Sequence, residues 1–351
     1  MTQKDSLTIK TLKRIPTLDG WRGIAILLVI ATHAQKGLFG GAFGGHKWLF
    51  FGRHGVAIFF VLSGYLITTR ILNEDRFSLR RFYLRRFFRL MPAAWIYLIA
   101  IGLFSLVSGL HVIGSDATAC VFFFRNYFPL KESSQNAFTS HFWSLSVEEQ
   151  FYLVWPAVLA ATGRRKAVFI AAAGALVCAG YRLMHWQTYN KVNFDTRSEV
   201  IFDGLLVGCI LAILLQEDGV KAWFARFYLP LLLLCTVAFP YYLANFQELI
   251  PFTESLLIAA AIGCTSTVPE CRLSRMLDRP LLSALGKISY SLYLWQEFFV
   301  LPRWAPVGLL LLPVVAIASW KLIEQPCIQW GRRLEARNTV QVRFQPGEMS
   351  F

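Results

Sequence analysis

The sequence has few charged residues for its length. Asp, Glu, Lys and Arg make up 16% of its 351 residues, whereas hydrophobic residues make up 56%. A soluble domain normally carries about 25% charged residues. This balance excludes an ordinary soluble enzyme and directs attention to segments that could cross a membrane.

Several common functional motifs are also missing. The sequence contains no Walker loop and no GxGxxG pattern, so it lacks the usual phosphate-binding loops of nucleotide-dependent enzymes. None of its seven cysteines forms a CxxC pair, and the sequence supports neither a metal site nor a disulfide framework. No internal repeat indicates the paired halves of a transporter. We therefore expect no bound metal.

Long hydrophobic runs are what the sequence has instead. Segments of about 18–22 residues, long enough to span hydrocarbon, recur along the chain, and we predict about ten transmembrane helices. Their predicted ranges are 22–39, 54–72, 92–110, 143–162, 167–186, 200–216, 227–245, 251–268, 283–301 and 304–323. The sequence thus predicts an all-α, polytopic integral membrane protein. It would have a basic tail at 1–17, a membrane domain at 18–328 and a second basic tail at 329–351.

Lys and Arg are concentrated in alternate loops. The first tail, the loop around 70–89, the GRRK stretch at 163–166, the loop at 272–279 and the last tail are all rich in them. Because positively charged loops remain in the cytoplasm, both termini are predicted to be cytoplasmic. This bias and attraction to anionic lipid account for the net charge of +14 without a nucleic-acid partner.

The first predicted helix carries two ionisable residues, Arg22 and His33. Eleven residues of helix bring the second to about 20° from the first, roughly 16 Å further along the axis. In a purely structural role, Arg22 could extend to the membrane surface and His33 could hydrogen-bond a neighbouring helix. Alternatively, both residues could belong to a functional site. A histidine can exchange a proton near neutral pH, which makes His33 a candidate catalytic base.

The second predicted helix contains the pair Ser63 and Gly64 among bulky residues. We interpret Gly64 as a site of close helix packing. Ser63 is a weak candidate for a nucleophile, because no strand–turn–helix motif surrounds it.

An arginine-rich stretch, SLRRFYLRRFFRLMP at 78–92, precedes the third predicted span. It could form an amphipathic helix on anionic lipid. It could equally form a phosphate site, because arginine binds phosphate oxygens through two nitrogens. Arg86 and Arg89 would share one helix face, and Arg85 lies beside them.

Adjacent carboxylates, Glu148 and Glu149, fall inside the fourth predicted span. Two ionisable groups in hydrocarbon indicate either pairing with an arginine or a functional site. Together with His141 and Tyr152 they form a polar stripe on an apolar helix.

These stretches together resemble the membrane-bound acyltransferase-3 family of bacterial O-acyltransferases. The resemblance covers residues 17 to 330 and rests on motifs in a fixed order. The motifs are LDGWRGIAILLVIATH, FFVLSGYLIT, RRFFRLMP, FWSLSVEEQFYLVWP, FDGLLVGCILA, ISYSLYLWQ and IEQP.

The resemblance implies a ten-helix fold in the bacterial inner membrane. Such proteins take an acyl group, usually acetyl from acetyl-CoA, on the cytoplasmic side and pass it to a hydroxyl of a glycan or another acceptor. The family's essential histidine matches His33 and its paired arginine matches Arg22. Its arginines after helix 2 match best at Arg86 and Arg89, and its helix-4 acid matches Glu148, with Glu149 beside it.

The sequence departs from the family pattern at Gln296. The family commonly has histidine after the tryptophan of this motif, so a proton-transfer role at this position is in doubt. The chain also has no room for the extra hydrolase-like domain that some members carry.

These observations give one mechanistic hypothesis. His33 acts as general base or carries the acyl group, while Glu148 or Glu149 orients it or raises its basicity. Arg22 and Ser63 line the path of acetyl-CoA, and the arginines of the 78–92 stretch hold its phosphates. Acceptor contacts are expected from His141, Arg197, Asp203 and Tyr152. The alternative is a transporter or flippase of an acylated or glycolipid substrate, which also needs buried charges but no phosphate-binding arginines.

Overall fold

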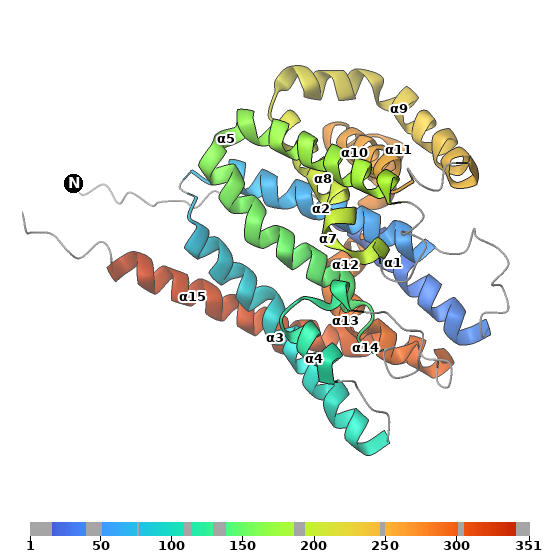
Figure 1. Ribbon diagram of the computed structural model, residues 1–351, viewed down its shortest axis with the longest axis vertical. Coiled ribbons are helices and arrows are strands. Elements are labelled where there is room, and N and C mark those ends of the chain that lie inside the picture. The colour runs from blue at the N-terminus through green and yellow to red at the C-terminus, as the bar shows by residue number, and fades with distance from the viewer. Residues whose placement is uncertain are drawn as a thin grey trace, which may run out of the picture.

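The computed structural model describes residues 16–39, 51–75, 77–108, 114–128, 138–185, 194–245, 250–300 and 305–341. Within these residues every regular element is a helix, as predicted (Figure 1). The longer helices are α1 (Pro16–Phe39), α2 (Phe51–Leu72), α3 (Leu79–Ser108), α5 (Phe142–Met184), α8 (Asp203–Leu214), α9 (Asp218–Asn245), α10 (Ile250–Thr267), α13 (Ser289–Phe299), α14 (Ala305–Ser319) and α15 (Gln325–Gln341). The shorter ones are α4 (Gly114–Val121), η2 (Arg125–Tyr127), η3 (Phe194–Thr196), α7 (Ser198–Ile201), α11 (Arg272–Leu277), α12 (Pro280–Lys287) and η4 (Trp320–Glu324).

Five helical segments in the described ranges are long and apolar enough to cross a membrane. They are Gly52–Leu72, Leu79–Ser108, Phe142–Met184, Asp218–Ala238 and Ala305–Glu335. In four of them much of the apolar surface points outward, as Leu106, Val107 and Leu310 illustrate, and this suits contact with lipid, whereas Gly52–Leu72 is mostly buried within the bundle. The architecture is that of a helical membrane protein. The count of ten spans and the cytoplasmic termini stay predictions.

Helix α5 contains a bend where the sequence predicts a loop. The predicted spans 143–162 and 167–186 are arms of one element that changes direction at Gly163, with φ 71° and ψ 169°. Figure 1 shows the two arms meeting at a sharp angle. Glycine has no Cβ and adopts this positive φ readily, so one residue suffices for the turn.

The C-terminal region continues as helix beyond the predicted last span. Helix α14 leads through the π-helical turn η4 into α15, which reaches Gln341 and packs against α3. The rings of Phe88 and Trp330 meet edge to face at 5.3 Å, and Arg85 Nη1 lies 3.1 Å from Glu335 Oε1. Most of the predicted 329–351 tail is therefore part of the helical bundle. Residues 342–351, like residues 1–15, lie outside the described ranges.

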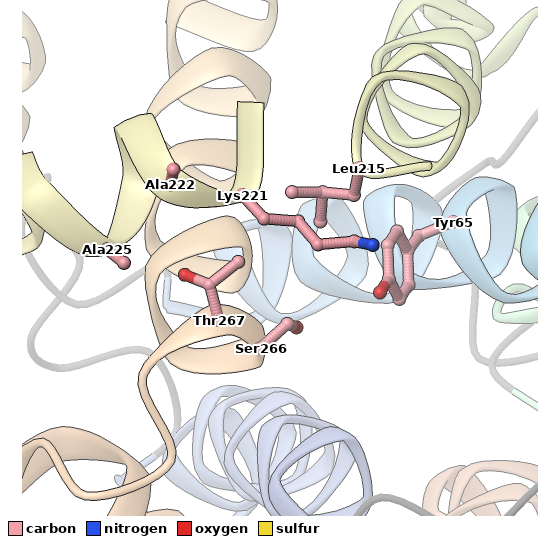
Figure 2. Close-up of a pocket in the computed structure, with 7 residues that line it drawn as sticks. All are labelled: Tyr65, Leu215, Lys221, Ala222, Ala225, Ser266 and Thr267. Carbon is pink, nitrogen blue, oxygen red and sulfur yellow. The ribbon is translucent and has the colours of Figure 1, made fainter. Parts of the chain in front are cut away.

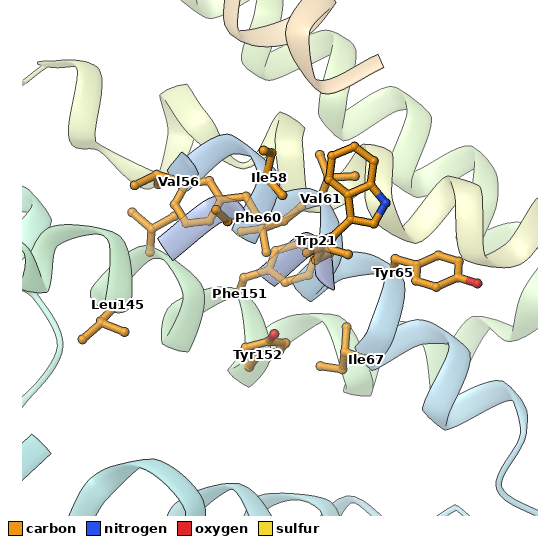
Figure 3. Close-up of a cluster of buried hydrophobic side chains, with 14 of the residues drawn as sticks. Trp21, Val56, Ile58, Phe60, Val61, Tyr65, Ile67, Leu145, Phe151 and Tyr152 are labelled. Carbon is orange, nitrogen blue, oxygen red and sulfur yellow. The ribbon is translucent and has the colours of Figure 1, made fainter. Parts of the chain in front are cut away.

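Helices α1 and α2 lie in the middle of the bundle. Helix α1 packs against α2, α12 and α13, and α2 also packs against α8 and α5. In Figure 3, Trp21 of α1, Phe60 of α2 and Phe151 of α5 belong to one buried apolar cluster. Polar residues on these central helices are consequently held in a protein interior rather than in lipid.

Gly64 is a point of close helix packing, as predicted. A Cβ on Gly64 would collide with the backbone carbonyl of Leu205 on α8, and a Cβ on Gly208 would collide with the carbonyl of Val61 on α2. The two helices pack with backbone against backbone here, which only residues without a side chain permit.

Substituting Gly64 with alanine is expected to destabilise the protein by about 1–3 kcal/mol, because the new methyl group has to push α8 away. The matched control is Gly102→Ala on α3, where an added Cβ meets no atom of the structure within 4 Å. The Gly102→Ala variant is expected to have an unchanged free energy of unfolding, or one raised by about 0.5–1 kcal/mol. Thermal unfolding in detergent measures both. Equal stability of the two variants would contradict the close packing of α2 on α8.

Candidate functional site

His33 is half-buried on α1, and its partner is Gln296 on α13. The ring nitrogen Nδ1 of His33 contacts the side-chain oxygen Oε1 of Gln296, which is fully buried. The carboxylate of Glu297, the next residue on α13, lies within electrostatic range of His33. The sequence hypothesis gave the orienting role to Glu148 or Glu149. The structure brings Gln296 and Glu297 to the histidine, and the orienting role of Glu148 or Glu149 stays a prediction.

Glu297 also holds a second histidine, His141, at the start of α5. Its Oε2 lies 2.8 Å from His141 Nδ1, and its Oε1 accepts a hydrogen bond of 2.5 Å from the Ser140 hydroxyl. His141 is 2% exposed. His141 was predicted to bind the acceptor, and the structure places it in this buried pair.

Glu148 lies between two hydroxyl groups. Its Oε1 accepts hydrogen bonds from Ser63 Oγ at 2.6 Å and from Tyr152 Oη at 2.8 Å. Ser63 thus meets the predicted helix-4 acid directly, 85 positions away in the sequence. A hydroxyl that donates to a carboxylate has its oxygen lone pairs still available, but no histidine contacts Ser63 among the described residues.

Glu149 forms an ion pair with Arg86 of α3. Arg86 Nη2 lies 2.5 Å from Glu149 Oε1, and Arg86 Nε lies 3.1 Å from Glu149 Oε2, so the contact is bidentate. The same guanidinium is 3.7 Å from Glu148 and lies over the ring of Tyr152, 3.1 Å from its centroid. A charge-assisted pair of this geometry is strong and fixes the two helices relative to each other.

Tyr293 of α13 connects the two halves of this arrangement. Its hydroxyl hydrogen-bonds Ser144 Oγ at 2.5 Å and the backbone oxygen of His141 at 3.1 Å. It lies within electrostatic range of both Glu148 and Glu297. We call the connected set the His33 cluster. Its members are Ser63, Arg86, His33, His141, Ser144, Glu148, Glu149, Tyr152, Tyr293, Gln296 and Glu297.

Arg22 is half-buried and lies on α1 beside the Glu148 end of the His33 cluster. It is close enough to Tyr152, Asp19 and Glu148 to interact electrostatically with each. Arg22 and His33 lie at opposite ends of the cluster, as their spacing on a single helix predicts.

The three arginines predicted to hold phosphates differ in their surroundings. Arg85 bonds Glu74 at 2.7 Å and Glu335 at 3.1 Å, and Arg86 is held by Glu149. Arg89 is exposed, lies within electrostatic range of Arg22, and has no ion pair in the described part of the chain. Of the three, Arg89 is therefore the one open to an anionic ligand.

The remaining predicted acceptor residues lie on the segment before and at the start of α8. Arg197 Nε is 3.2 Å from Glu199, and its guanidinium is 5.5 Å from the ring centroid of Tyr127. Asp203 is 2.6 Å from Arg182 of α5, and both side chains are 1% exposed. Neither is linked to the His33 cluster by an interaction that the structure describes, so their acceptor contacts stay predictions.

A hollow of about 360 Å³ lies on the other side of α2. Tyr65, Lys221 and Ser266 line it together with Leu215, Ala222, Ala225 and Thr267 (Figure 2). Tyr65 follows Ser63 by two residues, which places the two side chains on opposite faces of the helix. This hollow is thus separate from the His33 cluster. The described residues contain no group of His, Cys, Asp and Glu that could hold a metal ion.

Comparison with known proteins identifies what these helices belong to. The sequence model of a family described as an acyltransferase domain matches residues 15–322.

The chain belongs to the acyltransferase-3 family.

Its relatives carry related names. Peptidoglycan O-acetyltransferase OatA of Listeria monocytogenes is 28% identical over 89% of this chain and 53% of its own length. O-acetyltransferase OatA of Staphylococcus aureus is 28% identical over 90% of this chain and 58% of its own length. The present chain thus spans a little over half the length of these relatives. No solved structure matches it.

The acyltransferase-3 match ends at residue 322, before α15 begins at Gln325. All members of the His33 cluster lie inside the matched range. Gln296 and Glu297 are the members whose roles the sequence hypothesis missed. Their signal was available as two polar residues in succession near the end of the predicted span 283–301.

Proposed function

We propose that this protein is a membrane O-acyltransferase of the bacterial inner membrane. It moves an acyl group, acetyl first among the candidates, from acyl-CoA to a hydroxyl of a cell-envelope or secreted glycan. The observation that carries the proposal is a half-buried histidine held by polar partners inside the helical bundle of an acyltransferase family member. The names of the relatives make peptidoglycan the first acceptor to test.

The reaction follows from the chemistry of a thioester. The acceptor oxygen attacks the acyl carbon as His33 takes the hydroxyl proton. An ester C–O bond forms, the C–S bond breaks, and the proton returns to the leaving CoA thiolate. His33 suits this role because imidazole exchanges protons near neutral pH.

Donor binding is assigned to Arg89 and Arg22. CoA carries several phosphates, and arginine binds phosphate oxygens strongly. Arg89 is exposed and Arg22 lies near it, toward the Glu148 end of the cluster. Arg85 and Arg86 are engaged by carboxylates, and we assign them to holding α3 against α15 and α5.

The carboxylates of α5 keep the interior preorganised. Glu149 compensates the charge of Arg86, and Glu148 is fixed by the hydroxyls of Ser63 and Tyr152. Fixed dipoles and charges of this kind stabilise charge that develops during reaction without reorganising. Tyr152 contacts both Glu148 and Arg86, and we assign it to contact the acyl group or the acceptor.

The proposal is tested with membrane vesicles that contain the protein. Acetyl-CoA and purified peptidoglycan fragments are supplied on their own and together, and free thiol and ester-linked acetyl are both measured. Thiol release that requires the glycan and yields an equal amount of acetyl ester supports the proposal. Transport of a glycolipid or acylated sugar without any thiol release would favour the transporter alternative.

Replacing Arg89 with alanine is expected to raise the KM for acetyl-CoA about tenfold with little change in kcat. The reason is the loss of one charge-assisted phosphate contact, which contributes about 1.5–3 kcal/mol. The matched control is Arg80→Ala, which removes an exposed arginine in the first turn of the same helix. A KM unchanged in the Arg89 variant, or raised equally in both, would contradict this assignment.

A further inference from the structure

Gln296 is an unusual residue for the middle of an apolar bundle. It is fully buried, and its side-chain nitrogen Nε2 has no hydrogen-bond partner among the described residues. A buried amide that leaves a donor unsatisfied costs free energy. The one polar contact that its side chain makes in the described ranges is the one from Oε1 to His33 Nδ1.

We propose that Gln296 is a positioning residue that fixes the tautomer of His33, an inference that rests on the proposed acyl transfer. A carbonyl oxygen can only accept a hydrogen bond. When it faces Nδ1 of a neutral imidazole, that nitrogen has to carry the ring proton. The lone pair is then on Nε2, which is the nitrogen that takes the acceptor proton.

The Gln296 amide oxygen has the same position relative to His33 as the carboxylate has relative to the histidine of the serine hydrolase triad. There, an acidic group accepts the Nδ1–H of the histidine and leaves Nε2 as the base. Gln296 supplies the same acceptor without a charge. A neutral acceptor avoids placing another carboxylate next to Glu297, which already interacts with His33. Two adjacent residues of α13 thus serve different histidines, Gln296 for His33 and Glu297 for His141.

The side-chain nitrogen of Gln296 could donate a hydrogen bond to the substrate. Its two N–H groups have no partner in the described part of the protein, while the oxygen of the same amide contacts the proposed base. An N–H donor next to a base is suited to an oxygen of the acyl group or acceptor. The amide would then align the base and the substrate at once.

The decisive variants are Gln296→Met and Gln296→Glu. Methionine keeps the length and apolar packing of the side chain but removes the acceptor. We expect kcat to fall roughly 10- to 100-fold, by analogy with the loss seen when a group that orients a metal-binding histidine is removed. The KM for acetyl-CoA should stay within a factor of two or so, since the donor phosphates bind elsewhere. Glutamate keeps an acceptor oxygen but lacks the N–H donor, so Gln296→Glu should lose some activity, but less than Gln296→Met.

The tautomer is read directly by ¹⁵N NMR of histidine-labelled protein in nanodiscs. The His33 signal is assigned by its absence in His33→Gln. Wild type and Gln296→Glu should show a protonated Nδ1, and Gln296→Met should show a mixture or the other tautomer. The control is Gln216→Met, the same change at the end of α8, where the amide bonds Ala212; it should alter neither kcat nor the His33 signal.

The outcomes separate this inference from the proposed function. A lone pair on Nδ1 in wild type, or full kcat in Gln296→Met, overturns the inference while acyl transfer stands. If wild type releases no thiol from acetyl-CoA, the proposed function fails. The NMR comparison then decides alone whether Gln296 sets the His33 tautomer.

Discussion

Replacing His33 with alanine is expected to abolish acyl transfer and to leave acetyl-CoA binding nearly intact. Loss of a general base costs about 10²–10⁴-fold in rate, because the acceptor hydroxyl then has to attack with its proton still attached. Binding should persist because the residues proposed to hold the donor phosphates, Arg22 and Arg89, lie toward the other end of the cluster. Thiol release measures the first effect, and equilibrium binding of labelled acetyl-CoA in detergent measures the second.

A second membrane histidine provides the control. His54 on α2 is half-buried and lies 2.7 Å from Glu254 of α10, so it matches His33 in burial and in having a polar partner. His54→Gln keeps a group that can bond Glu254, and it should retain transfer. His33→Gln should be as inactive as His33→Ala. Loss of acetyl-CoA binding in the His33 variants, together with a normal KM in Arg89→Ala, would reverse the roles assigned to these residues.

Substituting Asp203 with alanine is expected to destabilise the protein by about 3–5 kcal/mol, because it leaves the guanidinium of Arg182 buried without its counter-charge. Arg182 and Asp203 are 1% exposed and 2.6 Å apart, and Arg182 also bonds the backbone oxygen of Val200. A surface carboxylate that merely contacted an acceptor would cost little stability. Thermal unfolding in detergent gives the effect.

The double variant Arg182→Met with Asp203→Leu separates structure from acceptor binding. Removing both charges together avoids the unpaired ion, and replacement of a buried pair by apolar residues is often neutral. If the pair is structural, the double variant recovers stability and transfers acyl groups with an unchanged acceptor KM. A stable double variant with a strongly raised acceptor KM would restore Asp203 to the acceptor site.

The candidate site was partly foreseeable from the sequence. Arg22, His33, Glu148 and Glu149 stand out because ionisable groups are costly in hydrocarbon, whichever way the helices pack. The resemblance then predicted which of them belong together. What it did not predict was the partner of His33, since Gln296 is 263 positions away and cannot titrate.

The sequence by itself determined that this is a helical membrane protein, because that class follows from the composition and from the length of the hydrophobic runs. Hydrophobic runs set the helical segments, and the positions of glycine allowed close packing at Gly64 and the bend at Gly163. Tertiary structure alone decided the pairings, since periodicity shows which face a side chain is on but not which helix meets that face. Helix order and tilt therefore brought Arg86 to Glu149, Arg182 to Asp203 and Gln296 to His33.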